Sequence, residues 1–233
     1  MAAAALPASM AYKWLSVLLC YPEQELLDAL PQLRQTLGEL SCLAPQRQAL
    51  TLFLDHLQSH SLRQLQEAYV ATFDRSRRQA LYLFEHVHGE ARERGEAMSD
   101  LLEEYRRYGF ELGDDELPDY LPALLEFFSH IPPEDAHKML GDAVHVIAHI
   151  ANQLHAGMSP YAALLDAAVA LSSVLPQPLA VPPVRDMDEA MEMFGPDEAG
   201  MEPLLMPRAE NVVKFYPRST AYGGAAPSQG EAK

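Results

Sequence analysis

The spacing of apolar residues is the feature that most constrains the fold of this chain. From the N-terminal region to about residue 175 of the 233, apolar side chains recur every three or four residues, and β-branched alternation is nearly absent. Leu62, Leu65, Tyr69 and Phe73 form one such series. Apolar residues at this interval share one face of a helix. We therefore predict an all-α protein, a single bundle of about eight to nine helices.

Several helix boundaries can be read from residue types. The stretch "SLRQ" fits a capping box that starts a helix after Ser61, and Ser159 followed by Pro160 is typical of an N-cap and first helical position. The stretch "QALYLFEHVHGEARERGEAMSDLLEEYRRYG" (79–109) predicts one long or once-broken helix that Gly109 closes, with Gly89 and Gly95 as weak points.

The composition changes sharply after residue 175. Pro and Gly recur there, apolar residues are isolated and no helical period is sustained. We predict a helical domain over 1–175 and a largely irregular tail, flexible or loosely docked, over 176–233, in which "NVVKFYP" (211–217) can dock as a short extended piece. The N-terminal region lacks a basic segment before its apolar residues, so we expect no targeting segment, no membrane insertion and a cytoplasmic protein.

Charge and cysteine content exclude several classes of function. A net charge of −16 opposes binding to nucleic acid, because phosphate binding requires clustered Lys and Arg. Cys20 and Cys42 are the only cysteines and form no CxxC, so we expect neither a disulfide framework nor a thiolate metal site.

Motifs that carry catalysis are missing as well. No GxSxG, GxGxxG or GxxxxGK[ST] occurs, and we expect no enzymatic activity. Asp142, His145 and His149 share one stripe of a predicted helix, but zinc would need another strong ligand. We interpret them as polar residues beside a core face, with a metal site as the alternative that elemental analysis would reveal.

Acidic residues gather around a proline-containing loop. Nine acidic residues and one basic residue, Lys138, lie between Glu111 and Asp142, which gives a local net charge of −8. Pro118 restricts the residue before it, so 113–119 is predicted to form a loop of fixed shape. An acidic rim beside apolar helix faces suits a peptide with basic and apolar residues. Alternatively, the acidity only keeps an exposed loop soluble.

Several motifs resemble a known family. "LFEHVHGE" (83–90), "RGEAM" (94–98), "LLEEY" (101–105) and "ELPDYLP" (116–122) are similar in order and spacing to the nitrate reductase assembly chaperones of the NarJ-type branch of the TorD/DmsD family. The resemblance implies a TorD-like helical chaperone that binds the N-terminal leader of the nitrate reductase α subunit. It also implies that the molybdenum bis-guanine dinucleotide and Fe–S cofactors belong to the client, that membrane docking is delayed, and that cofactor delivery proteins are candidate further partners.

The resemblance also implies a peptide-binding surface. An aromatic helix motif falls on Tyr69, Thr72 and Phe73, and a Pro-Asp-His loop falls on Pro118, Asp119 and Tyr120, where tyrosine replaces a histidine that could titrate near neutral pH. With the neighbouring apolar face, the predicted site comprises Tyr69, Thr72, Phe73, Leu117, Pro118, Asp119, Tyr120, Leu121, Leu124, Leu125 and Phe128.

Two interpretations of Asp119 stay open at this point. Its carboxylate can meet a basic group or the N-terminal end of a leader, or it can cap the helix that follows. A broader alternative is that the chain is a general helical adaptor or a membrane-surface protein without any role in cofactor assembly, although the acidic tail opposes binding to anionic lipid.

Overall fold

The computed structural model describes residues 6–88, 91–113, 116–179 and 216–217, and this part of the chain confirms the predicted all-α class. The α-helices are α1 (Ala8–Leu19), α2 (Gln24–Asp28), α3 (Leu30–Glu39), α4 (Arg47–Ser59), α5 (Leu62–Tyr69), α6 (Ala91–Arg107), α7 (Leu121–His130), α8 (Pro133–Ala156) and α9 (Ala162–Ala170). Short 3₁₀ segments cover Ser41–Gln46, Arg77–Gln79 and Leu83–Glu85, and a π segment covers Val70–Asp74.

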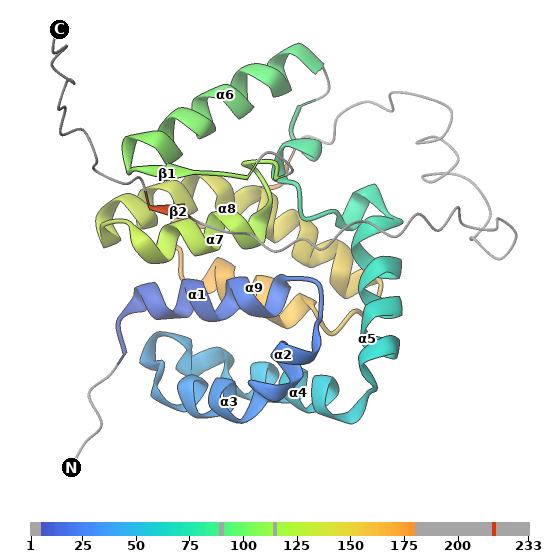
Figure 1. Cartoon of the computed structure of the whole chain (residues 1–233). Helices are drawn as coiled ribbons and strands as arrows, with labels where there is room; N and C mark the ends of the chain where they lie inside the picture. The colour runs from blue at the N-terminus through green and yellow to red at the C-terminus, as the bar shows by residue number, and fades with distance from the viewer. Residues whose placement is uncertain (1–5, 89–90, 114–115, 180–215, 218–233) are drawn as a thin grey trace, which may run out of the picture.

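The helices form layers around α1. In Figure 1, α1 and α9 lie in the middle, α3 and α4 on one side, and α7 and α8 on the other, with α6 as the outermost helix beyond them. α1 packs most extensively against α7. Ser16 Oγ donates a 2.8 Å hydrogen bond to the Pro122 carbonyl at this contact, and Lys13 forms an ion pair with Glu126. One continuous hydrophobic core joins these layers.

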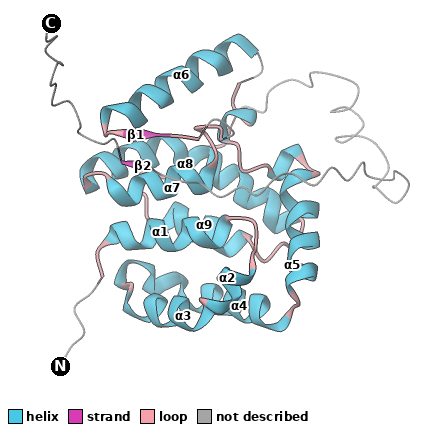
Figure 2. Cartoon of the chain, in the orientation of Figure 1, coloured by secondary structure: helices cyan, strands magenta, loops and turns pink. Residues whose placement is uncertain are grey.

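The segment 79–109 differs from its predicted form. Helical structure in its first part is limited to short 3₁₀ turns, and a regular helix, α6, begins only at Ala91 (Figure 2). The reason is a tertiary contact with the loop before α7: Leu83 N donates to Asp119 O at 3.1 Å, and Leu121 N donates to Leu81 O at 2.8 Å. These bonds hold Tyr82 extended, just before the 3₁₀ turn at Leu83–Glu85, against the local helical preference of the segment. Of the two predicted weak points, Gly89 lies outside the described residues, and the prediction at Gly95 is wrong, because α6 runs through it without a break.

Of the two predicted N-caps, one is confirmed and the other is wrong. Ser61 forms the expected capping box with Gln64 at the start of α5. The prediction at Ser159 is wrong, since α9 begins at Ala162 and Tyr161 is its N-cap residue. Ser159 N instead donates to Leu154 O at 2.9 Å, which closes the turn after α8.

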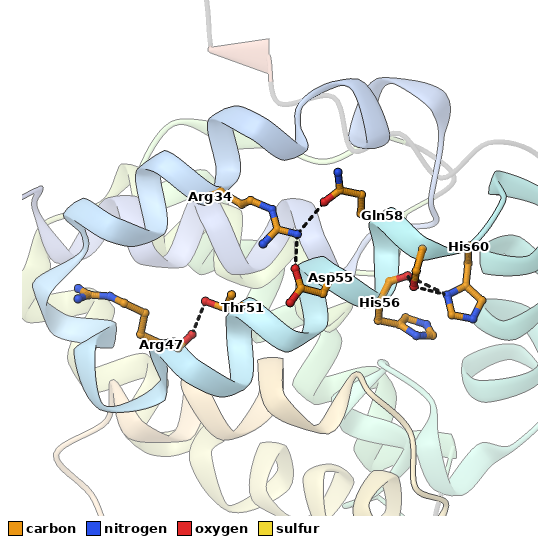
Figure 3. Close-up of polar contacts among 8 residues, drawn as sticks. Arg34, Arg47, Thr51, Asp55, His56, Gln58 and His60 are labelled. Atoms are coloured by element: carbon orange, nitrogen blue, oxygen red, sulfur yellow. Dashed lines mark hydrogen bonds and ion pairs between the residues drawn. The ribbon is translucent and has the colours of Figure 1, made fainter.

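Polar contacts join α3 and α4 on the side of the bundle away from α6. Arg34 Nη2 lies 2.6 Å from Asp55 Oδ1 and 3.0 Å from Gln58 Oε1 (Figure 3). Farther along α4, His60 Nδ1 lies 2.8 Å from the His56 carbonyl oxygen. The two contacts of Arg34 fasten α3 to α4, and the His60 contact lies within the end of α4. All of these groups are exposed or partly exposed, so none of them is in the apolar core.

One short extended piece of the C-terminal region is described. Tyr216–Pro217 (β2) pairs antiparallel with Phe110–Glu111 (β1), so the last two residues of the predicted 211–217 piece are extended and 211–215 lie outside the described residues. The division into domains at residue 175 stays a prediction. Within the described ranges, no helix combines the length and apolarity that a membrane span requires.

Candidate peptide-binding cleft

A cavity of about 630 Å³ lies between α6 and the α7–α8 layer. The turn at 83–88 closes one side of it. Its lining residues are Leu83, Phe84, Val87, His88, Ala97, Asp100, Leu101, Glu103, Glu104, Asp119, Leu124, Phe128, Met139, Asp142, Ala143 and Val146. A cavity of this size with mostly apolar walls is within the range of ligand-binding sites.

The floor of the cleft is apolar because α7 and α8 present apolar side chains toward α6. Leu124 and Phe128 come from α7, and Met139, Ala143 and Val146 come from α8. Phe128 is held from behind by an edge-to-face contact with the Tyr12 ring, at 5.8 Å between centroids. The floor is therefore built on the core and fixed before any ligand arrives.

The rim of the cleft is acidic. Asp100, Glu103 and Glu104 line it from α6, and Asp142 lines it from α8. No lysine or arginine is among the described residues that line the cavity. The field in the cleft therefore favours a positively charged ligand over a neutral or anionic one.

Asp119 lines the cleft with a carboxylate that is fully buried. Its Oδ2 accepts a 2.9 Å hydrogen bond from Phe84 N, whereas its Oδ1 is buried and has no partner within the described part of the chain. Burial raises the pKa of this carboxyl above its ordinary value of 3.8, while the Phe84 N–H and the charge of Arg94 act in the opposite direction. A buried acceptor without a partner is costly unless a ligand supplies the donor.

The alternative that Asp119 caps its own helix is wrong. The N-cap residue of α7 is Tyr120, and no side chain makes a capping hydrogen bond there. The carboxylate turns toward the 83–85 turn instead, because the loop pairs with that segment through the backbone.

α6 is fixed at its two ends and spans the cleft between them. Near its N-terminal end, Arg94 Nη2 lies 3.2 Å from Glu85 Oε1. Near its C-terminal end, the buried Tyr105 donates to Pro118 O at 3.2 Å and packs its ring against Phe127 at 4.3 Å. Gly109 follows with a φ of 81°, a left-handed conformation that ends the helical region as predicted.

Three residues of the predicted peptide-binding set, Asp119, Leu124 and Phe128, line the cleft. The aromatic members lie in the core instead: Tyr69 Oη is 3.0 Å from Tyr120 Oη and donates to Leu19 O at 2.9 Å. Phe73 stacks on Tyr69 at 4.8 Å. In this arrangement the aromatic motif supports the loop from behind, and none of its members lines the cavity.

The other predicted residues also lie away from the cavity lining. Pro118, Leu121 and Leu125 are buried, and Thr72 Oγ1 donates to the Ala68 carbonyl within its own helix. Leu117 is exposed, with 43% of its surface accessible. These positions do not contribute to the cleft in this structure.

Most of the cleft is formed by residues that the sequence reasoning did not select. These residues include Ala97, Asp100 and Leu101 in the α6 wall and Met139 and Ala143 in the α8 wall. The sequence of α6 offered a usable signal, because the helix has one acidic side and one apolar side. A helix whose apolar side has no partner in the core is a candidate wall of a binding site.

The two histidines of the metal hypothesis, His145 and His149, make different contacts. His145 Nδ1 accepts a 2.9 Å hydrogen bond from Gln177 N, and the His149 ring lies 5.8 Å from the ring of the buried His86. Among the residues that the structure describes, no three His, Cys, Asp or Glu side chains are grouped as metal ligands.

Comparison with known proteins gives consistent family matches. The profile of the family described as "Nitrate reductase delta subunit" matches residues 39–167. The chain is 41% identical over 125 residues to the nitrate reductase molybdenum cofactor assembly chaperone NarJ of Escherichia coli K12, a match that covers 54% of this chain and 53% of that protein. It is 42% identical over 123 residues to the probable chaperone NarW of the same strain, with 53% of each chain covered.

A Bacillus subtilis relative matches over more of its length. The probable nitrate reductase molybdenum cofactor assembly chaperone NarJ of strain 168 is 34% identical over 156 residues, which cover 67% of this chain and 84% of the relative. The match to the two E. coli proteins spans about half of their length. The matched stretch contains the cleft residues of α6, α7 and α8, and the chain belongs to the nitrate reductase delta subunit family.

Proposed function

We propose that this protein is an assembly chaperone for nitrate reductase that holds the N-terminal leader region of the catalytic α subunit in the cleft beneath α6. The observation that carries the proposal is the unpartnered, fully buried Oδ1 of Asp119 in an apolar cleft with an acidic rim. The names of the relatives, which are nitrate reductase molybdenum cofactor assembly chaperones, supply the client class.

The cleft fits a segment with an apolar stripe and at least one cationic group. Apolar side chains of the segment would pack on Leu124, Phe128 and Met139, which supplies affinity through burial. The carboxylates of the rim would orient the segment and increase its rate of association. A lysine, an arginine or the amino terminus of the segment would donate to Asp119 Oδ1, and a charge-assisted hydrogen bond of this kind is among the stronger polar contacts in proteins.

In this proposal the protein only binds the leader segment, and the client carries out the catalysis. The chaperone itself carries no cofactor and no catalytic group in this proposal. The molybdenum bis-guanine dinucleotide and the Fe–S cluster enter the client in the cytoplasm while its leader is occupied, and cofactor delivery proteins are further partners of the complex. Occupation of the leader also delays docking of the client at the membrane.

A variant that fills the cleft tests the proposal. Ala97 lines the cavity from α6, so Ala97→Phe would place a ring where the segment binds and leave the core unchanged. We expect a loss of affinity of about tenfold or more for a synthetic leader peptide of the α subunit, measured by isothermal titration calorimetry.

Ser99→Phe is the matched control, because Ser99 is exposed on the same helix and does not line the cavity. Its affinity for the peptide should equal that of the wild type. Equal affinity of all three proteins would place the binding site elsewhere, and no binding by the wild type would refute the proposed function.

A further inference from the structure

An ion pair joins α6 to the 83–85 turn, which holds the buried carboxylate of the cleft. Arg94 Nη2 of α6 lies 3.2 Å from Glu85 Oε1, and both side chains are 26% exposed. Glu85 is the residue after Phe84, whose N–H holds Asp119 Oδ2. The guanidinium of Arg94 is therefore held one residue away from the group that fixes Asp119, and its charge acts on that carboxyl.

The geometry points to a specificity device: we propose that Glu85 retains Arg94 and thereby keeps it from pairing with Asp119 Oδ1, so that a cation of the bound segment can pair with this oxygen instead. This inference rests on the proposed function and assigns two residues to it. Glu85 and Arg94 are positioning residues, since neither needs to touch the ligand, and Glu85 does not line the cavity.

The need for such a device follows from the strength of arginine–carboxylate pairs. A guanidinium presents several donors in a planar fork, and it pairs with a carboxylate in geometries that are strong when the pair is shielded from water. Asp119 is fully buried, and one of its two carboxylate oxygens has no hydrogen-bond partner among the described residues. A nearby guanidinium would therefore gain more from pairing with Asp119 than from contact with solvent. Without Glu85, Arg94 would occupy the oxygen that the ligand needs.

The pair also sets which ligand is preferred. Glu85 holds Arg94 in an ion pair, and the charged residues that line the cleft are all acidic. A segment with a cationic group gains the hydrogen bond to Oδ1, whereas a neutral segment of the same shape leaves this oxygen without a donor. The substrate class is therefore an apolar segment with a cation placed to reach the base of the cleft.

The experiment compares two peptides with four proteins. One peptide is the leader sequence of the α subunit, and the other has a blocked amino terminus and Gln in place of each Lys and Arg. The proteins are the wild type, Glu85→Gln, Arg94→Gln and the double variant, each as the full chain, with affinities from calorimetry and folding checked by circular dichroism.

We expect Glu85→Gln to weaken the charged peptide about tenfold, the scale of one hydrogen bond to a charged group, and to leave the neutral peptide unchanged. The double variant should restore the wild-type affinity, because the competing guanidinium is removed. Arg94→Gln alone should bind the charged peptide at least as tightly as the wild type.

A matched control exists on the exposed face of the same helix. Arg92 and Glu96 form an ion pair with the same 3.2 Å separation, and both side chains are largely exposed. Arg92→Gln and Glu96→Gln make the same changes in charge, and we expect both to keep the wild-type affinity within about twofold, because surface pairs contribute little.

Three outcomes would overturn the inference. Wild-type affinity in Glu85→Gln, an equal loss for both peptides, or no rescue in the double variant would each show that the pair only supports the fold. These results leave the cleft assignment intact as long as the wild type binds the charged peptide. If the wild type binds neither peptide, the proposed function fails and this inference fails with it.

Discussion

At the scale of single residues, Asp119 is the group that least fits a purely structural role. A carboxylate without exposure costs stability unless all its oxygens have partners, and one of the two oxygens of Asp119 has none. Sites that break a general rule of folding in this way are frequently functional. Motif resemblance selected this residue from the sequence, but only the structure shows that it lines the cleft and that one of its oxygens has no partner among the described residues.

Replacement of Asp119 by asparagine should separate binding from stability. Asp119→Asn keeps an oxygen for Phe84 N–H and removes the buried charge, so we expect unchanged or higher stability at neutral pH. For the leader peptide we expect a loss of affinity of about tenfold or more. Urea denaturation and calorimetry measure the two quantities, and a lower stability together with full affinity would contradict the expectation.

The same substitution should change how stability depends on pH. Because burial raises the pKa of Asp119 in the folded protein above 3.8, the folded state holds its proton more tightly than the unfolded chain. Its contribution to stability is present below the unfolded pKa and is lost as pH rises through the folded pKa. The stability advantage of Asp119→Asn should therefore grow from about pH 4 upward and level off once the pH is above the folded-state pKa. A constant difference between the two proteins over this range would show that Asp119 is not desolvated.

Tyr120 illustrates the limit of a motif at this scale. The sequence shows that a tyrosine replaces the usual histidine and that a hydroxyl and a ring are available for contacts. The structure uses both in the core: the hydroxyl bonds to Tyr69, and the ring packs on Tyr82 at 5.2 Å. The direction of a side chain at a loop position depends on neighbours that are distant in sequence, which a motif does not specify.

At the scale of elements, residue types near the helix ends predicted where helices begin. α5 begins directly after Ser61, as predicted, and α7 and α8 each carry a proline in their first turn, where it acts as a start signal. The prediction of a long helix over 79–109 was wrong in its first part, because residues 81–83 pair with 119–121. A contact between segments of this separation overrides helix propensity.

The capping box offers a test at this scale. Ser61→Ala removes the side-chain acceptor for Gln64 N, so we expect the free energy of unfolding to fall by about 1 kcal/mol. Chemical denaturation followed by circular dichroism measures this change. Ser59→Ala is the control, since Ser59 is the exposed last residue of α4, and its effect should be small. Equal effects of the two substitutions would show that the capping box does not stabilise the start of α5.

At the scale of the whole molecule, the core lies within the part of the chain before residue 180. The described hydrophobic cluster joins α1, α4, α7, α8 and α9, and Leu179 is the last residue that packs against it. The described contact beyond this point is the short β1–β2 pairing.

A chain shortened after Leu179 should therefore fold. We expect a cooperative unfolding transition and a helical circular dichroism spectrum, because the core is complete and only one two-residue pairing is lost. The leader peptide should still bind, since every described lining residue of the cleft is retained. Non-cooperative unfolding of the shortened chain would show that the C-terminal region is part of the folded domain, which would correct the predicted boundary at residue 175.

The sequence by itself determined the helical class, the loop that precedes α7 and the acidic character of this region, because periodicity, proline geometry and charge are encoded by neighbouring residues. Only the tertiary structure decided where the cleft lies and which side chains line it. Phe84, Leu101, Leu124 and Ala143 come from four separate segments. An apolar stripe specifies that a helix must pack, but its partner and the space left between them depend on how all the helices fit together.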